Sequence, residues 1–279
     1  MSGGGGQGTD PNRRDFLKNS AVIATGAAVG SIVPGKASAV APATPPDAFD
    51  LRTNKYITSI KDQHTCHSCT AFGVVATIEG SYHWQKNLPI STTKPELDLS
   101  EEELFKAPPV LGNCNIDHWW PRGALDYCIN NGVPKEGTTT NPYKILSKQQ
   151  LVANTVDATI TAMKSWISDP NNKGGPLVAV MVEYDDFLRF GANRTGKTDI
   201  TDVYEPGWET GSVKPKLVGG HVVSIVGYMD RGSSRYWICK NSWYINKGQP
   251  WNANGFVRIK MKGRSFIDRI DVWGVKVPV

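Results

Sequence analysis

Residues 63–84, QHTCHSCTAFGVVATIEGSYHW, place two cysteines directly before a helical pattern. From Cys69 onward, buried-type residues recur at helical intervals, which predicts a helix over residues 69–84. Two glycines within this stretch lower its intrinsic helix propensity, so contacts with the rest of the protein must hold the helix. The sequence therefore predicts a packed helix with Cys69 at its N-terminus.

Outward from this stretch, helical patterns come first and strand patterns follow. Further helices are predicted from Ser100, which has capping-box spacing to Glu103, and over residues 122–130 and 155–168. Strands rich in Val, Ile, Tyr and Trp are predicted over residues 176–183, 220–228, 235–240 and 255–262, with turns at residues 191, 196, 207 and 230–232. This order favours an α+β fold with two lobes and a functional site between them.

Composition and charge narrow the class of protein. The chain has 279 residues, of which 39% are hydrophobic and 20% are charged, as is typical of a globular protein. The net charge of +5 is spread along the chain without a long lysine or arginine block, so we expect no nucleic-acid binding. We expect a soluble monomer that needs no cofactor and no metal.

The first 39 residues have the pattern of an export signal. Arg13 and Arg14 precede Phe-Leu-Lys, an apolar run of 13 residues follows, and small residues stand at positions 37–39. The run is shorter than the about 20 residues of a membrane-spanning helix. The paired arginines resemble a bacterial twin-arginine signal, although they also fit the basic start of an ordinary signal. We expect residues 1–39 to be removed, residues 40–48 to form a linker, and the protein to be periplasmic or secreted, where disulfides can form.

The pair Cys66 and Cys69 allows four interpretations. A zinc site needs about four ligands, and the other cysteines are isolated in the sequence. Haem attachment needs a histidine directly after the second cysteine, where Thr70 stands. A redox dithiol is expected in a βαβ unit, which the surrounding pattern lacks. The fourth interpretation is a nucleophilic Cys69, because a helix N-terminus favours the thiolate.

A cysteine nucleophile also needs a base and a group that orients the base. His221 begins an apolar strand pattern in GGHVVSIVGY, and Asn241 ends another in YWICKNSW. Both belong to the strand-rich half of the chain, so we expect them to face Cys69 from the other lobe.

At these residues the chain resembles the papain-like (C1) cysteine proteases. The resemblance rests on Gln63 before Cys69, the Gly-His strand and the Lys-Asn-Ser-Trp motif, and it extends over about residues 49–262. It implies the papain-like two-lobed α+β fold over residues 49–279. A mainly helical N-terminal lobe (about residues 60–153) and an antiparallel, β-barrel-like C-terminal lobe (about residues 154–279) would enclose the active-site cleft.

The resemblance also implies a role for each matching residue. Cys69 would be the nucleophile and His221 its base, and Asn241 would orient the imidazole ring. The side chain of Gln63 and the backbone N–H of Cys69 would bind the oxyanion. Trp243 would shield the Asn–His hydrogen bond from water.

A disulfide between Cys66 and Cys114 is implied in the same way. It would close a loop of about 49 residues, which the chain-entropy model values at roughly 4 kcal/mol. The remaining cysteines, Cys128 and Cys239, are expected to be buried thiols.

The chain departs from the family pattern mainly in the substrate groove. The predicted groove residues are His67, Ile116, Asp117 and Val222. His67 and Tyr244 replace glycines that are usual in the family, and Thr70 replaces an aromatic residue. These changes leave the predicted triad intact and indicate an unusual substrate specificity.

The sequence therefore predicts a cysteine peptidase that acts on peptide or protein substrates through a Cys69 acyl-enzyme. Little chain lies between the export signal and the catalytic unit, so we expect the activity to be restrained by a separate inhibitor protein or by reduction of the Cys66–Cys114 pair. Two alternatives stay open. One is a non-catalytic papain-like module that binds peptides or cell-envelope ligands, and the other is a disulfide oxidoreductase that uses Cys66 and Cys69.

Overall fold

The computed structural model describes residues 44–115, 119–171, 173–193, 202–208, 214–245, 249–252 and 254–278. The predicted export signal, residues 40–43 of the predicted linker, and the groove residues Ile116 and Asp117 lie outside this part. Its helices are α2 (Cys69–Gln85), α3 (Glu101–Phe105), α4 (Pro121–Asn130), α5 (Val156–Ile167) and α6 (Asp185–Ala192). No helix in the described ranges is both long enough and apolar enough to cross a membrane.

The predicted helix over residues 69–84 is confirmed as α2, which begins at Cys69. Its two glycines allow close packing on both sides. A Cβ atom at Gly73 would lie 2.7 Å from Cγ1 of Val222, and one at Gly80 would lie 2.6 Å from Cγ of Pro176. The glycines that weaken the isolated helix therefore allow Val222 of β5 and Pro176, directly before β3, to approach its axis.

The other predicted helices are also present; side-chain caps begin α3 and α5, whereas α4 begins at Pro121 without a side-chain cap. Ser100 accepts a hydrogen bond from the backbone N–H of Glu103 at 3.4 Å, and Thr155 accepts one from Ala158 at 3.1 Å. Each cap satisfies an N–H group that has no partner within its helix.

One expected turn is wrong, because residue 191 lies inside α6. A Cβ atom at Gly191 would lie 1.7 Å from the ring of Trp251, so only glycine allows this contact. The glycine therefore serves the packing of α6 on an aromatic ring that is distant in sequence.

The strands form an eight-stranded sheet with the order β2-β10-β3-β5-β6-β9-β4, and β1 also pairs with β5. The pairs are antiparallel except for β4 with β9. The strands of this sheet are β1 (Ala48–Asp50), β2 (Ser147–Gln150), β3 (Leu177–Tyr184), β4 (Val203–Tyr204), β5 (Leu217–Arg231), β6 (Ser234–Lys240), β9 (Phe256–Lys260) and β10 (Asp271–Lys276). A separate pair consists of β7 (Tyr244–Ile245) and β8 (Gln249–Pro250).

The four predicted strands correspond to β3, β5, β6 and β9, and β5 extends beyond its predicted bounds at both ends. The hairpin between β5 and β6 turns at Gly232, which has a positive φ of 59°. The other strands, β1, β2, β4, β7, β8 and β10, were not predicted. Ala48, the last residue of the predicted linker, belongs to β1.

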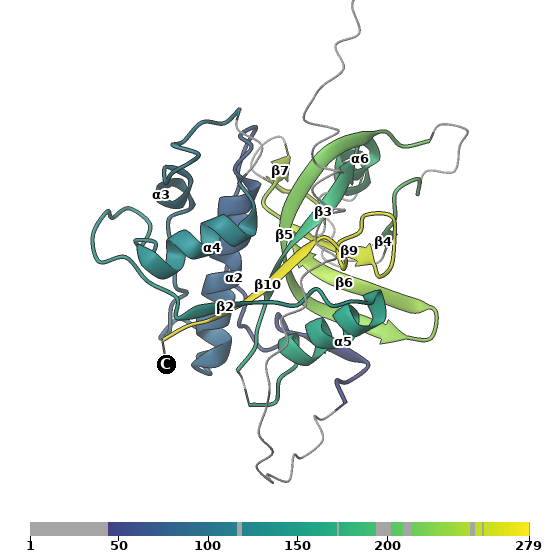
Figure 1. Cartoon of the computed structure of the whole chain (residues 1–279), viewed down its shortest axis with the longest axis horizontal. Coiled ribbons are helices and arrows are strands. Elements are labelled where there is room, and N and C mark those ends of the chain that lie inside the picture. Colours follow the sequence, from purple (N-terminus) through teal and green to yellow (C-terminus); the bar gives the residue numbers. More distant parts are fainter. Residues whose placement is uncertain are drawn as a thin grey trace, which may run out of the picture. The chain divides into compact units, whose positions relative to one another are not determined.

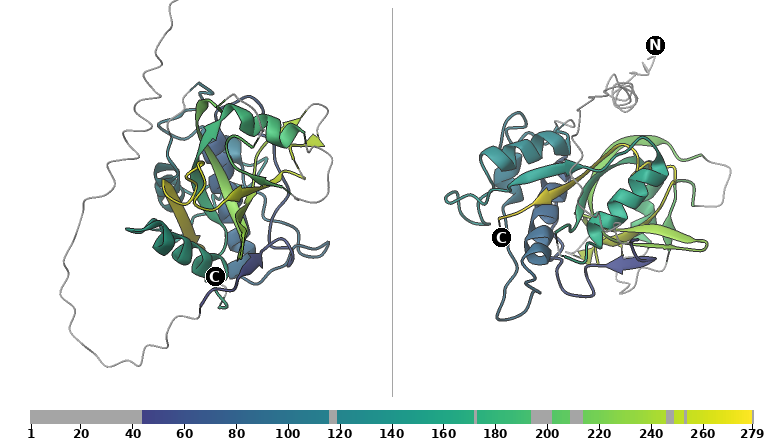
Figure 2. Two further views of the ribbon diagram at one scale, coloured as in Figure 1. Left: turned by 90° about the vertical axis from the view of Figure 1, so that its right-hand side faces the viewer. Right: turned by 60° about the horizontal axis from the view of Figure 1, so that its bottom comes forward.

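Two groups of elements separate in space (Figure 1). Helices α2, α3 and α4 lie together on one side, and strands β5, β6 and β9 lie on the other with α5 and α6 beside them. The two further views agree with this separation (Figure 2). We call these groups the helical lobe and the β lobe. The mixed content and the mostly antiparallel sheet agree with the predicted two-lobed α+β fold.

The first strand of the described part contacts the β lobe, and the last strand reaches the helical lobe. Strand β1 pairs with β5 of the β lobe. Strand β10 pairs with β2 and β3, and the residues at its end reach α2, where Gln85 donates to the carbonyl of Val275 at 2.8 Å and accepts from the N–H of Val277 at 3.0 Å. The predicted boundary near residue 153 stays a prediction.

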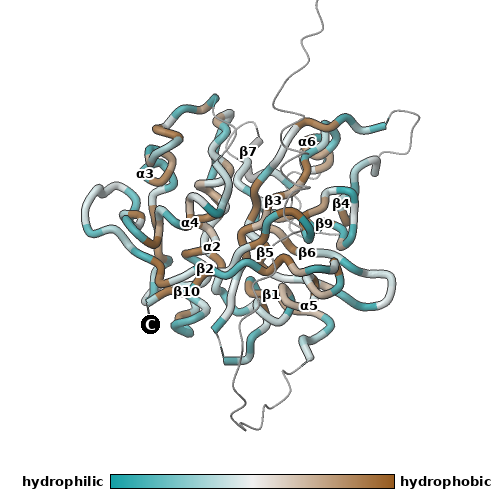
Figure 3. The backbone as a smooth tube through the Cα atoms, in the orientation of Figure 1, coloured by the Kyte–Doolittle hydropathy of each residue, from teal (hydrophilic) through white to brown (hydrophobic). Residues whose placement is uncertain are grey.

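The main apolar core lies in the β lobe. Figure 3 shows hydrophobic segments along β3, β5 and β6 and along α2. The largest fully buried side chains of this core include Trp237, Trp251, Tyr204, Tyr228 and Phe187. Five bulky aromatic side chains make the β lobe a rigid support for the residues at its surface.

Candidate active site

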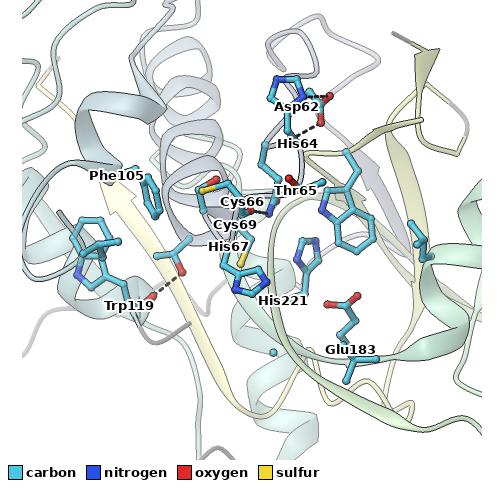
Figure 4. Close-up of a pocket in the computed structure, with 18 of the residues that line it drawn as sticks. Asp62, His64, Thr65, Cys66, His67, Cys69, Phe105, Trp119, Glu183 and His221 are labelled. Carbon is cyan, nitrogen blue, oxygen red and sulfur yellow. Dashed lines mark hydrogen bonds and ion pairs between the residues drawn. The ribbon is translucent and has the colours of Figure 1, made fainter. Parts of the chain in front are cut away.

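A cleft of about 810 Å³ lies between residues of the two lobes (Figure 4). The lining from the helical side and its preceding loop includes Gln63, Cys66, His67, Cys69, Thr70, Phe105 and Trp119. The lining from the β side includes Glu183, Leu188, Val218, Gly220, His221, Trp243 and Tyr244. The cleft therefore brings the predicted nucleophile and the predicted base to one site.

Cys69 is the first residue of α2 and is only partly buried. The positive end of the helix dipole at this position favours negative charge on the sulfur atom. The other two cysteines outside the disulfide are buried, and burial raises the pKa of Cys128 to about 12 and that of Cys239 above its usual value. Among these three thiols, Cys69 is thus the one placed to react.

His221 and Asn241 form a buried hydrogen bond of 2.7 Å between Nε2 and Oδ1. The amide oxygen can only accept, so Nε2 carries the proton and the neutral ring keeps Nδ1 as its basic atom. Burial lowers the pKa of His221 to about 4, and the hydrogen bond to Asn241 opposes this shift. At neutral pH the ring is therefore a neutral base of fixed orientation.

Aromatic rings hold this pair from the side of the β lobe. The ring of Trp243 lies 4.4 Å from that of His221, centroid to centroid, at an interplanar angle of 32°. Phe187 lies 5.6 Å from Trp243 and 4.9 Å from Trp251. The rings exclude water from one side of the imidazole, which strengthens its hydrogen bond to Asn241.

Gln63 lies at the edge of the cleft and is itself fixed by hydrogen bonds. Its Oε1 accepts from the hydroxyl of Ser242 at 2.6 Å, and its Nε2 donates to the carbonyl of Cys66 at 2.8 Å. An amide nitrogen has two protons, so a second N–H remains for a ligand in the cleft. The backbone N–H of Gln63 also donates to the carbonyl of Ser242 at 2.9 Å, which ties this loop to the segment directly after β6 that carries Asn241.

The comparisons with known proteins agree with this arrangement. The sequence profile described as papain family cysteine protease matches residues 45–269.

The chain belongs to the papain family of cysteine proteases.

Individual relatives are distant. Zingipain-2 from Zingiber officinale is 27% identical over 213 residues, which cover 76% of this chain and 86% of that protein. Papaya proteinase 4 from Carica papaya is 30% identical over 217 residues, which cover 77% of this chain and 56% of that protein. The chain thus spans most of the first relative and little more than half of the second.

A solved structure supports the fold independently. Bromelain from Ananas comosus, in complex with the E64 inhibitor, has a TM-score of 0.58 and 22% sequence identity, and the match covers 84% of this chain and 100% of that chain. At this identity the likeness shows the fold alone, and it confirms the predicted papain-like fold.

The predicted disulfide between Cys66 and Cys114 is present, with the two Cα atoms 4.7 Å apart. It joins the loop before α2 to the loop after α3, and the N–H of His67 donates to the carbonyl of Cys114 at 3.4 Å. Because Cys66 is bonded to Cys114, it forms no dithiol with Cys69. The structure therefore contradicts the alternative of a disulfide oxidoreductase that uses this pair.

Two departures from the papain family have local structural roles. Thr70 is buried, and its hydroxyl donates to the carbonyl of Trp119 at 2.6 Å, which fixes one wall of the cleft. The hydroxyl of Tyr244 donates to the carbonyl of Ile60 at 3.1 Å, and Tyr244 lines the cleft. Both substitutions therefore change the cleft walls rather than the hydrogen-bonded pair His221 and Asn241.

Two predicted groove residues have different positions. His67 lines the cleft near Cys69 and His221, as Figure 4 shows. Val222 is 5% exposed and packs against Gly73 of α2, behind the cleft wall, so its expected groove role is corrected to a packing role.

A cluster of buried charges lies beneath the helical wall. Nζ of Lys61 lies 2.9 Å from a carboxylate oxygen of Glu101 and 3.5 Å from one of Glu79. Glu79 also accepts from the hydroxyl of Thr58 at 2.7 Å, and Thr58 accepts from Nζ of Lys240 at 2.8 Å. Burial and the charge of Glu79 raise the pKa of Glu101, and burial lowers the pKa of Lys240. The cluster links the segments that carry Gln63, Cys69 and Asn241.

Sequence reasoning missed several residues that shape the cleft. Ser242 lies within the recognised Lys-Asn-Ser-Trp motif, and its hydroxyl was a usable signal for a partner of Gln63. Glu183 stands at the end of a predicted apolar strand, where a single charge could have been noticed. Phe187 belongs to α6, which had no clear sequence pattern.

The described residues contain no group of three or more His, Cys, Asp or Glu side chains that could hold a metal ion.

Proposed function

We propose that the protein is a cysteine peptidase that hydrolyses peptide bonds through an acyl-enzyme on Cys69. The observation that carries this proposal is the buried hydrogen bond of 2.7 Å between His221 and Asn241 in the cleft that Cys69 also lines. Membership of the papain family supports the same reaction.

In the first half of the reaction, Nδ1 of His221 accepts the thiol proton of Cys69. The sulfur attacks the substrate carbonyl carbon, and the carbonyl oxygen becomes an oxyanion. The second N–H of Gln63 and the backbone N–H of Cys69 donate to this oxyanion. His221 then gives its proton to the departing amine as the C–N bond breaks, which leaves an acyl-enzyme thioester.

In the second half, His221 accepts a proton from water while the water oxygen attacks the thioester carbonyl. Collapse of this intermediate breaks the C–S bond, releases the carboxylic acid, and returns the proton to the sulfur of Cys69. Asn241 and Trp243 keep the imidazole ring in one orientation through both halves.

Brief alkylation with iodoacetamide, without reductant, tests this proposal. We expect label at Cys69 and loss of peptide hydrolysis in proportion to the label, while the buried Cys128 and Cys239 stay unlabelled. Mass spectrometry locates the label, and Cys69→Ala provides the matched inactive control. Hydrolysis by Cys69→Ala at the wild-type rate would refute the acyl-enzyme.

A non-catalytic peptide-binding module is a second candidate, because His67, Thr70 and Tyr244 alter the cleft. This function predicts saturable peptide binding, no hydrolysis, and slow alkylation of Cys69. The same labelling experiment, with a fluorescent peptide for the binding measurement, separates it from the peptidase.

We also propose that residues 1–39 are a bacterial twin-arginine signal, followed by a linker over residues 40–48. The motif at Arg13 and Arg14 supports this, as does the Cys66–Cys114 disulfide, since disulfides persist mainly outside the cytoplasm. The protein would then be periplasmic or secreted and would act as a monomer on peptide substrates. Replacing both arginines by lysine should retain the protein in the cytoplasm of a bacterial host, as measured by cell fractionation.

A further inference from the structure

Gln63, the proposed oxyanion donor, stands at the end of a segment without regular secondary structure. Residues 58–63 belong to no helix or strand, so contacts with other elements must fix their position. Ser242 holds Gln63 itself, since its carbonyl accepts from the backbone N–H at 2.9 Å and its hydroxyl donates to Oε1 at 2.6 Å. The position of the donor also depends on what holds the residues directly before it.

Tyr244 holds this segment at two points. Its hydroxyl donates to the carbonyl of Ile60 at 3.1 Å, and its backbone N–H donates to Oδ1 of Asp62 at 3.2 Å. The same oxygen of Asp62 accepts from the backbone N–H of His64 at 2.9 Å. Figure 4 shows Asp62 and His64 together at one end of the cleft. Through Asp62, Tyr244 is therefore connected to the residues on both sides of Gln63.

Tyr244 is itself anchored in the β lobe. It begins β7, which pairs with β8 at Pro250. The next residue, Trp251, is fully buried in the apolar core, and its backbone N–H donates to the carbonyl of Trp243 at 2.9 Å. Tyr244 therefore joins the rigid core of the β lobe to the segment that precedes Gln63.

Ile60 is also in close contact with Gly255. A Cβ atom at Gly255 would lie 2.6 Å from Cγ1 of Ile60, so there is no room for a side chain between them. The carbonyl of Gly255 accepts from the backbone N–H of Asn241 at 2.9 Å. The segment before Gln63 and the residue that orients His221 therefore share one neighbour, and a shift of Ile60 would disturb a tightly packed place.

The proposed reaction requires an accurate position of Gln63. Its second N–H must lie about 2.7–3.1 Å from the substrate oxygen that becomes the oxyanion, and complete loss of such a donor costs about 10²–10³-fold in kcat. A donor that is only displaced should cost less. The papain family usually has glycine where this chain has Tyr244, and glycine has no hydroxyl that could hold Ile60.

We propose that Tyr244 is a positioning residue for the oxyanion site. It holds Ile60 and Asp62 so that the second N–H of Gln63 faces the substrate carbonyl oxygen, and it acts on the reaction through Gln63. The inference rests on the proposed peptidase function and gives a role to a residue that the proposed mechanism does not use.

Steady-state kinetics of Tyr244→Phe with a fluorogenic peptide test this proposal. The change removes the hydrogen bond to Ile60 and keeps the ring and the backbone bond to Asp62. We expect kcat to fall by about three- to tenfold, the range for one net hydrogen bond, while KM stays within about twofold of the wild-type value. Timed alkylation of Cys69 should continue at the wild-type rate, because this reaction forms no oxyanion.

A double-mutant cycle with Gln63→Ala separates positioning from a merely structural role. If Tyr244 acts through Gln63, Tyr244→Phe should change kcat by less than about 1.5-fold once Gln63 is alanine. Tyr56→Phe is a matched control, because the hydroxyl of Tyr56 donates to Oδ1 of Asn87 at 2.6 Å, outside the described lining of the cleft. This control should keep the wild-type kcat.

The outcomes distinguish the two proposals. An unchanged kcat in Tyr244→Phe, the same fold loss in both backgrounds, or an equal fall in kcat and in the alkylation rate would overturn the role of Tyr244 and leave the peptidase standing. A wild type that hydrolyses no peptide and whose Cys69 resists alkylation would overturn the peptidase and the positioning role together.

Discussion

The two walls of the cleft are supported in different ways. Beneath the helical wall, Lys61 pairs with Glu101 and Glu79, and the hydroxyl of Thr58 connects Glu79 to Lys240. Behind the β wall, His221 rests on aromatic rings that belong to the apolar core. A buried charge depends on its partners, because a charge that loses its compensation inside the protein is strongly destabilising. Ring contacts are spread over many atoms, so partial losses cost less.

The two kinds of support predict different effects of mutation on the geometry of the site. The charged cluster connects segments that are distant in sequence, since Thr58 and Lys240 are 182 residues apart. The aromatic contacts only orient residues of the β lobe. Damage to the cluster should therefore affect stability and the whole site, whereas damage to the rings should affect His221 first.

The largest effect is expected for Glu79→Gln. The change removes the main negative charge near the buried Lys240, which Thr58 connects to Glu79, while Lys61 keeps Asp98 at 2.6 Å and Glu101 at 2.9 Å. The free energy of unfolding should fall by about 3–5 kcal/mol, because the charge of Lys240 loses its compensation. Urea denaturation followed by tryptophan fluorescence measures this loss. Glu102→Gln on the exposed side of α3 should change it by less than about 0.5 kcal/mol. If the free energy of unfolding of Glu79→Gln falls as little as that of Glu102→Gln, the charged cluster does not support the helical wall as argued above.

Gln63→Ala tests the loop that the cluster supports. It removes one proposed oxyanion donor, so kcat should fall by about 10²–10³-fold while alkylation of Cys69 continues at a similar rate. Steady-state kinetics and timed labelling measure the two quantities. An equal fall in kcat and in the alkylation rate would indicate that the loop has moved and that the donor role of Gln63 is wrong.

Acid should destabilise the β wall through His221. Its pKa is about 4 in the folded protein and 6.5 as the ordinary value, so the unfolded chain binds the proton first as the pH falls. The neutral His221 ring contributes about 3 kcal/mol to the free energy of unfolding above about pH 6.5, and this contribution is lost as the pH falls from 6.5 to 4. Denaturation at pH 7 and pH 4 gives the free energy of unfolding at each pH. The decrease between the two values should be smaller for His221→Gln than for the wild type. If the free energy of unfolding of His221→Gln falls as much as that of the wild type, the acid sensitivity belongs to other groups.

Trp243→Phe should have the smallest effect. A phenyl ring keeps part of the contact with His221 and Phe187, so kcat/KM should fall only severalfold, in line with about 0.5–1.5 kcal/mol for an aromatic pair. Trp243→Ala should cost more, because water then reaches the hydrogen bond between His221 and Asn241. Equal activity of both variants would show that shielding is not the function of this ring.

The sequence located the residues that we propose to react better than the residues that support them. Cys69, His221 and Asn241 lie in short local motifs, and the predicted disulfide partner Cys114 was found in the same way. Helix α6 was missed because Gly191 resembles a turn residue until its contact with Trp251 is known. Strand β1 has only three residues, too few for a periodic pattern. The Lys61–Glu79–Lys240 connection depends on contacts between distant segments, which no local pattern encodes.

The first and last strands of the described part each contact a lobe far away in the sequence, and this should affect how the protein behaves after its backbone is cleaved. Strand β1 pairs within the β lobe, whereas β10 continues to Gln85 at the end of α2. Cleavage of the backbone between the lobes, in the connection from β2 to α5, would therefore release neither lobe. The two fragments would stay assembled through hydrogen bonds at both ends, elute together under native conditions, and separate only in denaturant.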